Sequence, residues 1–105
     1  MANLPVKTTK DLIPETNEAY NQIRKKLLDE ATVDEKTLEM MILCYAIADK
    51  CENCINAHMK LLIQLGATEQ DIATCAGVGI VMGGGPGRQY GNIALEAYYK
   101  YAKKK

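Results

Sequence analysis

Apolar residues recur every three or four positions along most of this 105-residue chain, which is the spacing of one face of an α-helix. A first helix is predicted over 15–31, where such residues form one stripe and where Pro14 suits a first helical turn. Residues 1–14, which contain two prolines, are predicted to form an irregular arm. The stripe consists of Tyr20, Ile23, Leu27 and Leu28.

Every residue from 40 to 48 is apolar, and a helix buried on nearly all sides accounts for such a run better than a two-sided amphipathic one. This second helix is predicted to start within Thr32–Asp34, because Thr32 and Glu35 stand at the spacing of a capping box. Glu39 heads the apolar run, and its i+3, i+4 and i+7 neighbours are all apolar. Its side chain is therefore expected on the apolar face.

Two further helices are bounded by recognisable caps. The third is predicted to begin within 51–54 and to end at Leu65, with Gly66 as a left-handed C-terminal cap. Thr68 and Asp71 resemble another N-cap arrangement, which opens a fourth helix.

Glycines punctuate the last third of the chain. Gly77 and Gly79 lower the helix propensity of the fourth helix, so close packing against another backbone is expected there. The run GGGPG at 83–87 is predicted to break the chain before a last helix over 88–103. This run lacks the Gly-Lys-Ser/Thr ending of a phosphate-binding loop and follows no strand, so it is interpreted as a turn.

The pattern as a whole predicts an all-α protein with an N-terminal arm, 1–14, and one helical domain, 15–105. Thirteen basic and thirteen acidic residues cancel, so no broad positive field is available for a nucleic acid or an anionic membrane. The amino-terminal residues lack the apolar core of a signal peptide, and no apolar run approaches the roughly 20 residues that cross a bilayer. A cytoplasmic location is therefore expected.

The stretch CENCINAH, residues 51–58, holds two of the four cysteines and the single histidine. In a reducing compartment such cysteines are expected to be catalytic, metal-binding or buried rather than a structural disulfide framework. On a helix that advances ~100° per residue, Cys51, Cys54 and His58 project on one face. Helical side chains lean towards the amino terminus, so the His58 imidazole is predicted to lean over Cys54 as a base for its thiol.

The cysteine pair also lies where a helix begins, and there unpaired N–H groups and the helix dipole favour an anion. Together with an imidazole, this position can lower the pKa of a thiol from about 8.5 towards neutrality and so raise the thiolate population. The other cysteine of the pair can then close a disulfide after attack on a peroxide or on another disulfide. Glu39 adds a carboxyl that could pass protons beside a histidine, or could instead point to solvent from a first helical turn.

These residues stand in the pattern of a known family. Glu39, eleven residues, Cys51, two residues, Cys54, three residues and His58 resemble the alkylhydroperoxidase D (AhpD) core within the carboxymuconolactone decarboxylase-like family. The resemblance extends to the turn LGATEQDI and to GGGPG, and it covers roughly residues 30–100. It implies an AhpD-like fold of about five to six helices, assembled as a homotrimer or homohexamer, with the cysteine pair in a cleft between helices.

The resemblance also implies an activity, that of an antioxidant peroxidase or disulfide reductase. Cys54 is then the nucleophile and Cys51 the resolving residue, with His58 as general base and Glu39 as proton relay. No bound cofactor or metal is expected, and the substrate is a small hydroperoxide or disulfide. An external dithiol donor, either a protein or a lipoyl- or thioredoxin-like group, must reopen the oxidised pair.

This chain departs from the family pattern between the two cysteines. Some members carry a further histidine there, whereas this chain has Glu52 and Asn53. A negative Glu52 disfavours a thiolate at Cys51, which leaves open a pair tuned to another substrate.

Two alternatives to a thiol redox enzyme remain at this level. One is a carboxymuconolactone decarboxylase-type lyase, although members with that activity generally lack the cysteine pair. The other is a non-catalytic metal site in which the pair and His58 bind the ion, with Cys44, Cys75 or Glu39 as a fourth ligand. Outside such a site, Cys44 and Cys75 are interpreted as small core hydrophobes.

Overall fold

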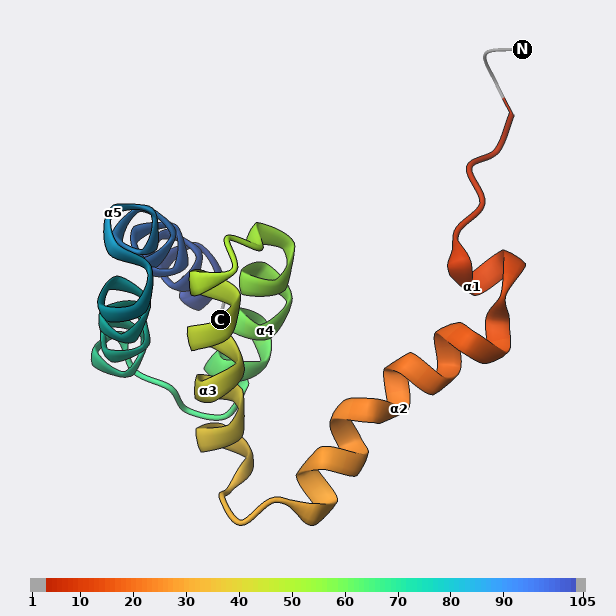
Figure 1. The fold of residues 1–105 in the computed structure, drawn as a ribbon, viewed down its shortest axis with the longest axis horizontal. Helices are drawn as coiled ribbons and strands as arrows, with labels where there is room; N and C mark the ends of the chain where they lie inside the picture. Colours follow the sequence, from red (N-terminus) through yellow and green to blue (C-terminus); the bar gives the residue numbers. More distant parts are fainter. Residues whose placement is uncertain (1–3, 104–105) are drawn as a thin grey trace. The chain divides into compact units, whose positions relative to one another are not determined.

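The computed structural model describes residues 4–103, and every regular element in that range is a helix. The elements are α1 (Thr9–Leu12), α2 (Pro14–Glu30), α3 (Glu35–Ala48), α4 (Glu52–Gln64) and α5 (Glu69–Ala102) (Figure 1). The expected all-α class is therefore confirmed. Residues 1–3 of the predicted arm and residues 104–105 of the predicted domain lie outside the described range. The chain divides into two units, Met1–Thr32 and Val33–Lys105.

The first unit holds α1 and α2 and buries none of their residues. The prediction of an irregular arm is wrong for residues 9–12, which form one helical turn. Asp11 explains this turn, because its carboxylate accepts a hydrogen bond from the backbone N–H of Thr8 at 2.9 Å. Pro14 opens α2 as its position predicted. The stripe of α2 leaves Tyr20, Ile23 and Leu27 exposed within this unit.

The start of α3 differs from the expected capping box. Asp34 is the N-cap, and its side chain accepts from the backbone N–H of Thr37 at 2.8 Å. Asp34 lies inside the predicted window, but Thr32 is not the N-cap residue. Thr32 and Asp34 each have a side-chain oxygen that can cap a helix. The helix begins after Asp34, because Asp is at least as good an N-cap residue as Thr.

The burial of α3 is also one-sided rather than complete. Leu43 and Ile47 are fully buried, whereas Met41 is 56% exposed and Tyr45 is 71% exposed. The expectation that residues 40–48 are buried on nearly all sides is therefore wrong within this unit. An apolar stripe remains on the outer face of α3.

Helix α4 and the turn after it follow the predicted caps. Gly66 has φ +87°, in the left-handed region that suits a glycine at a helix C-terminus. Thr68 and Asp71 form a capping box at the start of α5: the backbone N–H of Thr68 donates to Asp71, and that of Asp71 donates to the Thr68 hydroxyl. Both turns depend on local groups, which is why the sequence identifies them.

Helix α5 consists of two arms, residues 69–83 and 85–102, separated by a kink at Gly84 with φ 63° and ψ −139°. The break predicted within GGGPG is thus confirmed. The arms fold back antiparallel, and the Tyr99 hydroxyl at the end of one donates to Glu69 at the start of the other over 3.2 Å.

Glycines allow close approach at the centre of this helical hairpin. A Cβ at Gly79 would overlap the side chain of Ile47, and a Cβ at Gly87 would overlap the carbonyl of Gly79. A Cβ at Gly91 would lie 2.8 Å from that of Ala76. Gly79 is closely packed as expected, but what excludes a Cβ there is the Ile47 side chain rather than another backbone. The expectation is wrong for Gly77, where a Cβ would meet nothing within 4 Å.

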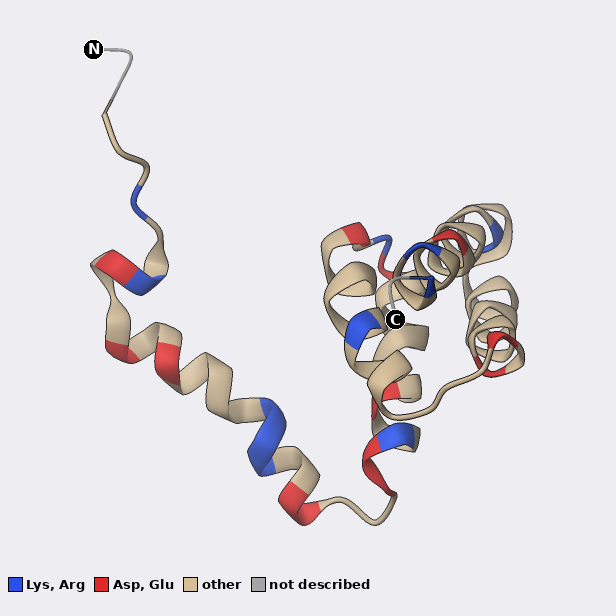
Figure 2. Cartoon of the chain, turned by 180° about the vertical axis from the view of Figure 1, so that it is seen from behind, with Lys and Arg blue, Asp and Glu red and all other residues tan. Residues whose placement is uncertain are grey.

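The core of the second unit lies between α3, α4 and both arms of α5, which contact one another (Figure 1). Because the chain has no Phe or Trp, aliphatic side chains fill it. Acidic and basic residues are interspersed along the helices (Figure 2). Within residues 4–103 no helix is both long and apolar enough to span a bilayer. The largest fully buried side chains are Leu43, Ile47, Ile55, Met59, Leu62, Ile72, Glu39 and Cys75.

Candidate functional site

Glu39 is fully buried on α3, and its carboxylate contacts the imidazole of His58 on α4. The distance from Oε1 of Glu39 to Nδ1 of His58 is 2.6 Å. The solvent-facing alternative for Glu39 is therefore wrong, and the expected position on the apolar face is correct. A buried carboxylate needs such a partner, because an unpaired charge in the core is strongly unfavourable.

This contact sets the roles of the two ring nitrogens. A carboxylate only accepts hydrogen bonds, so Nδ1 of His58 carries the proton and donates it to Glu39. In the neutral ring Nε2 then holds the free lone pair. The His58 side chain is 28% exposed, so the ring joins the core to the surface. The hydrogen bond to Glu39 therefore uses Nδ1, and Nε2 is the ring nitrogen that does not face that carboxylate.

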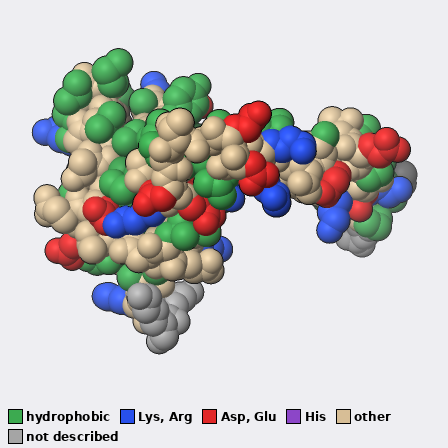
Figure 3. Space-filling view, turned by 90° about the horizontal axis from the view of Figure 1, so that it is seen from below, with side chains coloured by type: hydrophobic (Ala, Val, Ile, Leu, Met, Phe, Trp, Pro, Cys, Tyr) green, Lys and Arg blue, Asp and Glu red, His purple; other side chains and the backbone are tan. Residues whose placement is uncertain are grey.

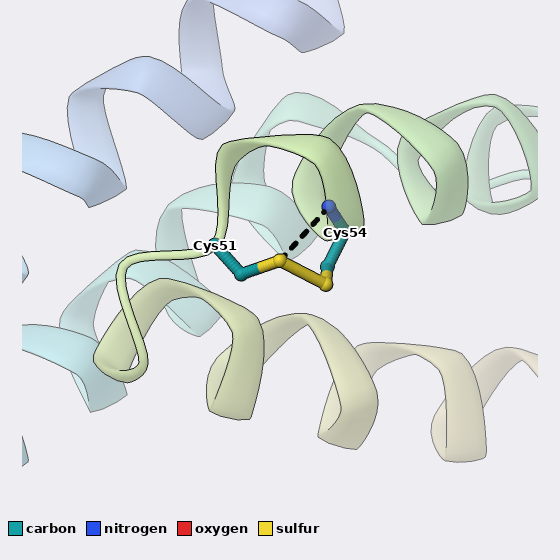
Figure 4. The surroundings of a disulfide bond; sticks show 2 residues. All are labelled: Cys51 and Cys54. Atoms are coloured by element: carbon teal, nitrogen blue, oxygen red, sulfur yellow. Dashed lines mark hydrogen bonds between the residues drawn. A yellow bond between two sulfur atoms is a disulfide. The ribbon is translucent and has the colours of Figure 1, made fainter. Parts of the chain in front are cut away.

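Cys51 and Cys54 are joined by a disulfide at the first turn of α4, with their Cα atoms 5.3 Å apart (Figure 4). Cys51 is the N-cap of the helix, and its Sγ accepts a hydrogen bond from the backbone N–H of Cys54 at 3.3 Å. The residue before it, Lys50, has φ +58°, a conformation that side-chain-bearing residues rarely adopt. This sharp turn between α3 and α4 places Cys51 at the cap.

The two sulfurs differ in their surroundings. Cys54 is exposed, whereas Cys51 is half-buried and receives the N–H at the positive end of the helix dipole. Negative charge is therefore better stabilised on the Cys51 sulfur, and attack from outside is easier on the Cys54 sulfur.

The four residues predicted from sequence lie in two contacts that share α4. One contact is Cys51 with Cys54, and the other is Glu39 with His58. Cys54 and His58 are one helical turn apart on α4, in the order that directs the histidine towards the cysteine.

A shallow groove of about 170 Å³ lies between α4 and the second arm of α5, and neither cysteine lines it. Helix α4 contributes Glu52 from between the cysteines, and the second arm of α5 contributes Glu96 and Lys100. The sequence did not reveal this groove, because helical spacing shows which residues share a face but not which other helix packs against that face. The full lining is Glu52, Asn56, Ile93, Glu96, Ala97 and Lys100.

A larger groove of about 360 Å³ is lined by Lys60, Ile63, Gln64 and Tyr101 and contains none of the predicted site residues. Its size does not make it the chemical centre. The cysteine pair and His58 lie elsewhere on α4 and Glu39 lies on α3, so the candidate site is assigned on chemistry rather than on volume.

The ligand set considered for a metal is not assembled. The sulfurs of Cys51 and Cys54 are bonded to each other, and the ring of His58 is paired with Glu39. Among residues 4–103 no three His, Cys, Asp or Glu side chains gather in a group suited to a metal ion.

Comparisons with known proteins agree with the fold. The sequence model of the carboxymuconolactone decarboxylase family matches residues 14–97. An uncharacterized protein of Cupriavidus necator is 27% identical over 86 residues, which are 82% of this chain and 75% of that protein. The apo crystal structure of a carboxymuconolactone decarboxylase family protein from Legionella pneumophila superposes with a TM-score of 0.84 at 29% identity. That match covers 90% of this chain and 84% of the other.

Proposed function

We propose, from the premise that this chain belongs to the carboxymuconolactone decarboxylase family, that it is a thiol-dependent oxidoreductase that reduces hydroperoxides or disulfides through Cys51 and Cys54. The observation that carries the proposal is the combination on α4 of a cysteine disulfide at the helix N-terminus and a histidine bonded to a buried glutamate. Such a combination supplies a nucleophile, a resolving thiol and a route for protons.

The oxidative half-reaction starts at Cys54, because its sulfur is the exposed one. His58 takes the thiol proton at Nε2, and the thiolate attacks one oxygen of the hydroperoxide. The O–O bond breaks, and the alkoxide leaves as an alcohol with the proton held by His58. Cys54 is then a sulfenic acid, and a disulfide substrate would give a mixed disulfide by the same attack.

Cys51 completes this half-reaction. Its thiolate attacks the Cys54 sulfur, the new S–S bond forms, and the S–O bond breaks. The hydroxide leaves as water with the proton that the Cys51 thiol gave up. The Cys54 N–H that the Cys51 sulfur accepts in the disulfide also stabilises that thiolate beforehand. Cys51 therefore suits the resolving role even with the negative Glu52 beside it.

Reduction of the disulfide needs an external dithiol, either a protein or a lipoyl- or thioredoxin-like group. Its thiolate attacks the exposed Cys54 sulfur, and Cys51 leaves as a thiolate stabilised at the helix N-terminus. The second donor thiol then frees Cys54. A reducing cytoplasm would supply such donors.

Glu39 acts through His58 as a positioning and relay residue. Its carboxylate holds the ring with Nδ1–H towards the core and stabilises the imidazolium that forms when Nε2 takes the proton. The same pairing returns the ring to its starting tautomer after the alcohol leaves.

A lyase of the kind for which the family is named would leave the cysteine pair without a role, so no specific observation favours it here. The family includes both types of activity, and the cysteine pair supports the redox activity for this chain.

We also propose that the protein works as a homotrimer or homohexamer. Apolar side chains appear on the surface of the second unit, Val33–Lys105 (Figure 3). Tyr45 is 71%, Val81 81% and Met82 76% exposed. Packing against further copies would remove this surface from water, in line with the small size of the chain.

The deciding experiment is a panel of alkyl hydroperoxides and small disulfides, assayed for turnover with dithiothreitol or a lipoyl dithiol as donor. Wild-type protein should turn over at least one class, Cys54→Ser should be inactive, and the control Cys44→Ser, which removes a different thiol, should retain activity under these reducing conditions. Equal turnover by Cys54→Ser and wild type would remove the proposal.

A further inference from the structure

A second pair of thiols lies outside the proposed site, between α3 and the first arm of α5. Cys44 is half-buried on α3, and Cys75 is 1% exposed on α5. Cys44 is among the neighbours that raise the pKa of the Cys75 thiol, which indicates that the two thiols are near each other. The Cys75 thiol also donates to the carbonyl of Met40 at 3.5 Å, one turn before Cys44. Since helical side chains lean towards the N-terminus, Cys44 leans over that same turn.

The helices on either side hold these thiols together. One turn earlier in α5, Asp71 pairs with Lys36 of α3, with 2.9 Å between nitrogen and oxygen. One turn later, Gly79 meets Ile47 where no Cβ would fit. The two helices therefore run in the same direction here and approach closely. A disulfide needs Cα atoms about 4.4–6.8 Å apart, and a close parallel approach brings facing residues of two helices towards that range.

We propose that Cys44 and Cys75 form a second redox couple, whose disulfide links α3 to the first arm of α5. The oxidant is a hydroperoxide, and it meets the more accessible Cys44 first. The Cys44 sulfur attacks one peroxide oxygen, the O–O bond breaks, and the thiol proton leaves with the alcohol. The sulfenic acid at Cys44 then condenses with Cys75: the S–S bond forms, the S–O bond breaks, and the Cys75 proton leaves in water.

Two features make this couple slower than the pair on α4. Burial, followed by the neighbouring Cys44, raises the pKa of the Cys75 thiol to about 12, so little of it is a thiolate at neutral pH. Cys44 is also less exposed than Cys54. The second couple therefore responds to sustained peroxide rather than to each turnover. Its disulfide would lock the turn of α3 that follows Glu39, and a donor dithiol would reopen it.

The test uses the full-length Cys51→Ser/Cys54→Ser variant, which keeps only the second couple and does not depend on the proposed function. Treatment with excess cumene hydroperoxide should abolish both remaining free thiols, lower the intact mass by two hydrogens, and yield a peptide pair joined through Cys44 and Cys75. Dithiothreitol should restore both thiols, and the oxidised form should melt at a higher temperature than the reduced one.

The matched controls add Cys44→Ser or Cys75→Ala to that variant, and neither should form an internal link. Cys44→Ser changes a half-buried position, so it keeps the test valid if Cys75→Ala folds poorly. Two thiols that persist after prolonged peroxide would overturn the proposal. So would oxidation of Cys44 to a sulfinic acid without a link, or a bond formed only between separate chains.

Discussion

The carboxylate of Glu39 and Nδ1 of His58 lie 2.6 Å apart, which joins α3 to α4 through a buried charge and a half-exposed ring. The two residues are nineteen positions apart in sequence. Because this contact directs Nδ1–H into the core, it leaves the other ring nitrogen for chemistry at the surface. The proposed mechanism depends on that orientation.

Glu39→Gln should lower the rate of Cys54 oxidation roughly 10-fold or more, because an amide keeps the shape but not the charge that stabilises the imidazolium. Stopped-flow measurements at a series of pH values give the rate of Cys54 oxidation, and the part of the pH profile that reflects His58 should change. Glu35→Gln on the same helix is the control and should follow wild type. If the double variant Glu39→Gln/His58→Gln loses the full product of the single effects, the two residues do not act as a relay.

Cys51→Ser should stop turnover of a disulfide substrate at the mixed disulfide between Cys54 and one half of the substrate, because the thiol that closes the internal disulfide is gone. Intact mass measurement after exposure to a small disulfide should show one adduct per chain, removable with dithiothreitol. Cys54→Ser should show no adduct at the site. An adduct on Cys51 in the Cys54→Ser variant, with none on Cys54 in the Cys51→Ser variant, would exchange the two roles.

Gly79→Ala should destabilise the helical unit by about 1–3 kcal/mol, because the added methyl group overlaps the buried side chain of Ile47. Gly77→Ala, two residues away in the same helix, is the matched control. Its methyl group meets nothing within 4 Å, so it should be neutral or should stabilise by about 0.5–1 kcal/mol. Urea unfolding followed by circular dichroism compares them, and equal effects would contradict the packing described.

Stability should fall as the solution is acidified below about pH 4, in part through Asp71. The hydrogen bond from the Thr68 backbone, and then Lys36, lower the pKa of this carboxyl below its usual value of 3.8. A lowered folded-state pKa contributes stability that is complete above the unfolded-state pKa and is lost as pH falls through the folded-state one. Between about pH 5 and pH 2, the free energy of unfolding of Asp71→Asn should therefore fall less than that of wild type or of the exposed control Asp49→Asn. Parallel losses in all three would exclude this contribution.

Met82→Lys should shift the assembly towards monomers if the exposed apolar surface of α5 lies between subunits, because a buried unpaired ammonium is strongly unfavourable. Light scattering after size exclusion gives the mass, and circular dichroism checks that the helices persist. Gln89→Lys, at an exposed polar position of the second arm of α5, should leave the assembly unchanged. A monomeric wild type would remove the proposed trimer or hexamer.

Local signals in the sequence determined most of the helical framework. Gly66, the Thr68 and Asp71 capping box and the break within GGGPG each act through groups a few residues apart, so the pattern that encodes them is contiguous. The start of α4 follows the same rule, because its N-cap residue, Cys51, lies only three residues before Cys54, whose N–H it accepts. The prediction failed at Thr32, where Asp34 offered a competing cap within the same few residues.

Tertiary structure decided everything that depends on which helix faces which. The sequence left Glu39 open between a buried relay and a solvated first turn, and the packing of α4 on α3 buried it against His58. It placed Cys44 and Cys75 in the core separately, whereas the parallel run of α3 and α5 brought them together. The sequence pattern also predicted that residues 40–48 are buried on nearly all sides, although the second unit covers only one side of α3. Helical periodicity specifies a face from neighbouring residues alone, but the partner of that face is set by contacts between segments distant in the chain.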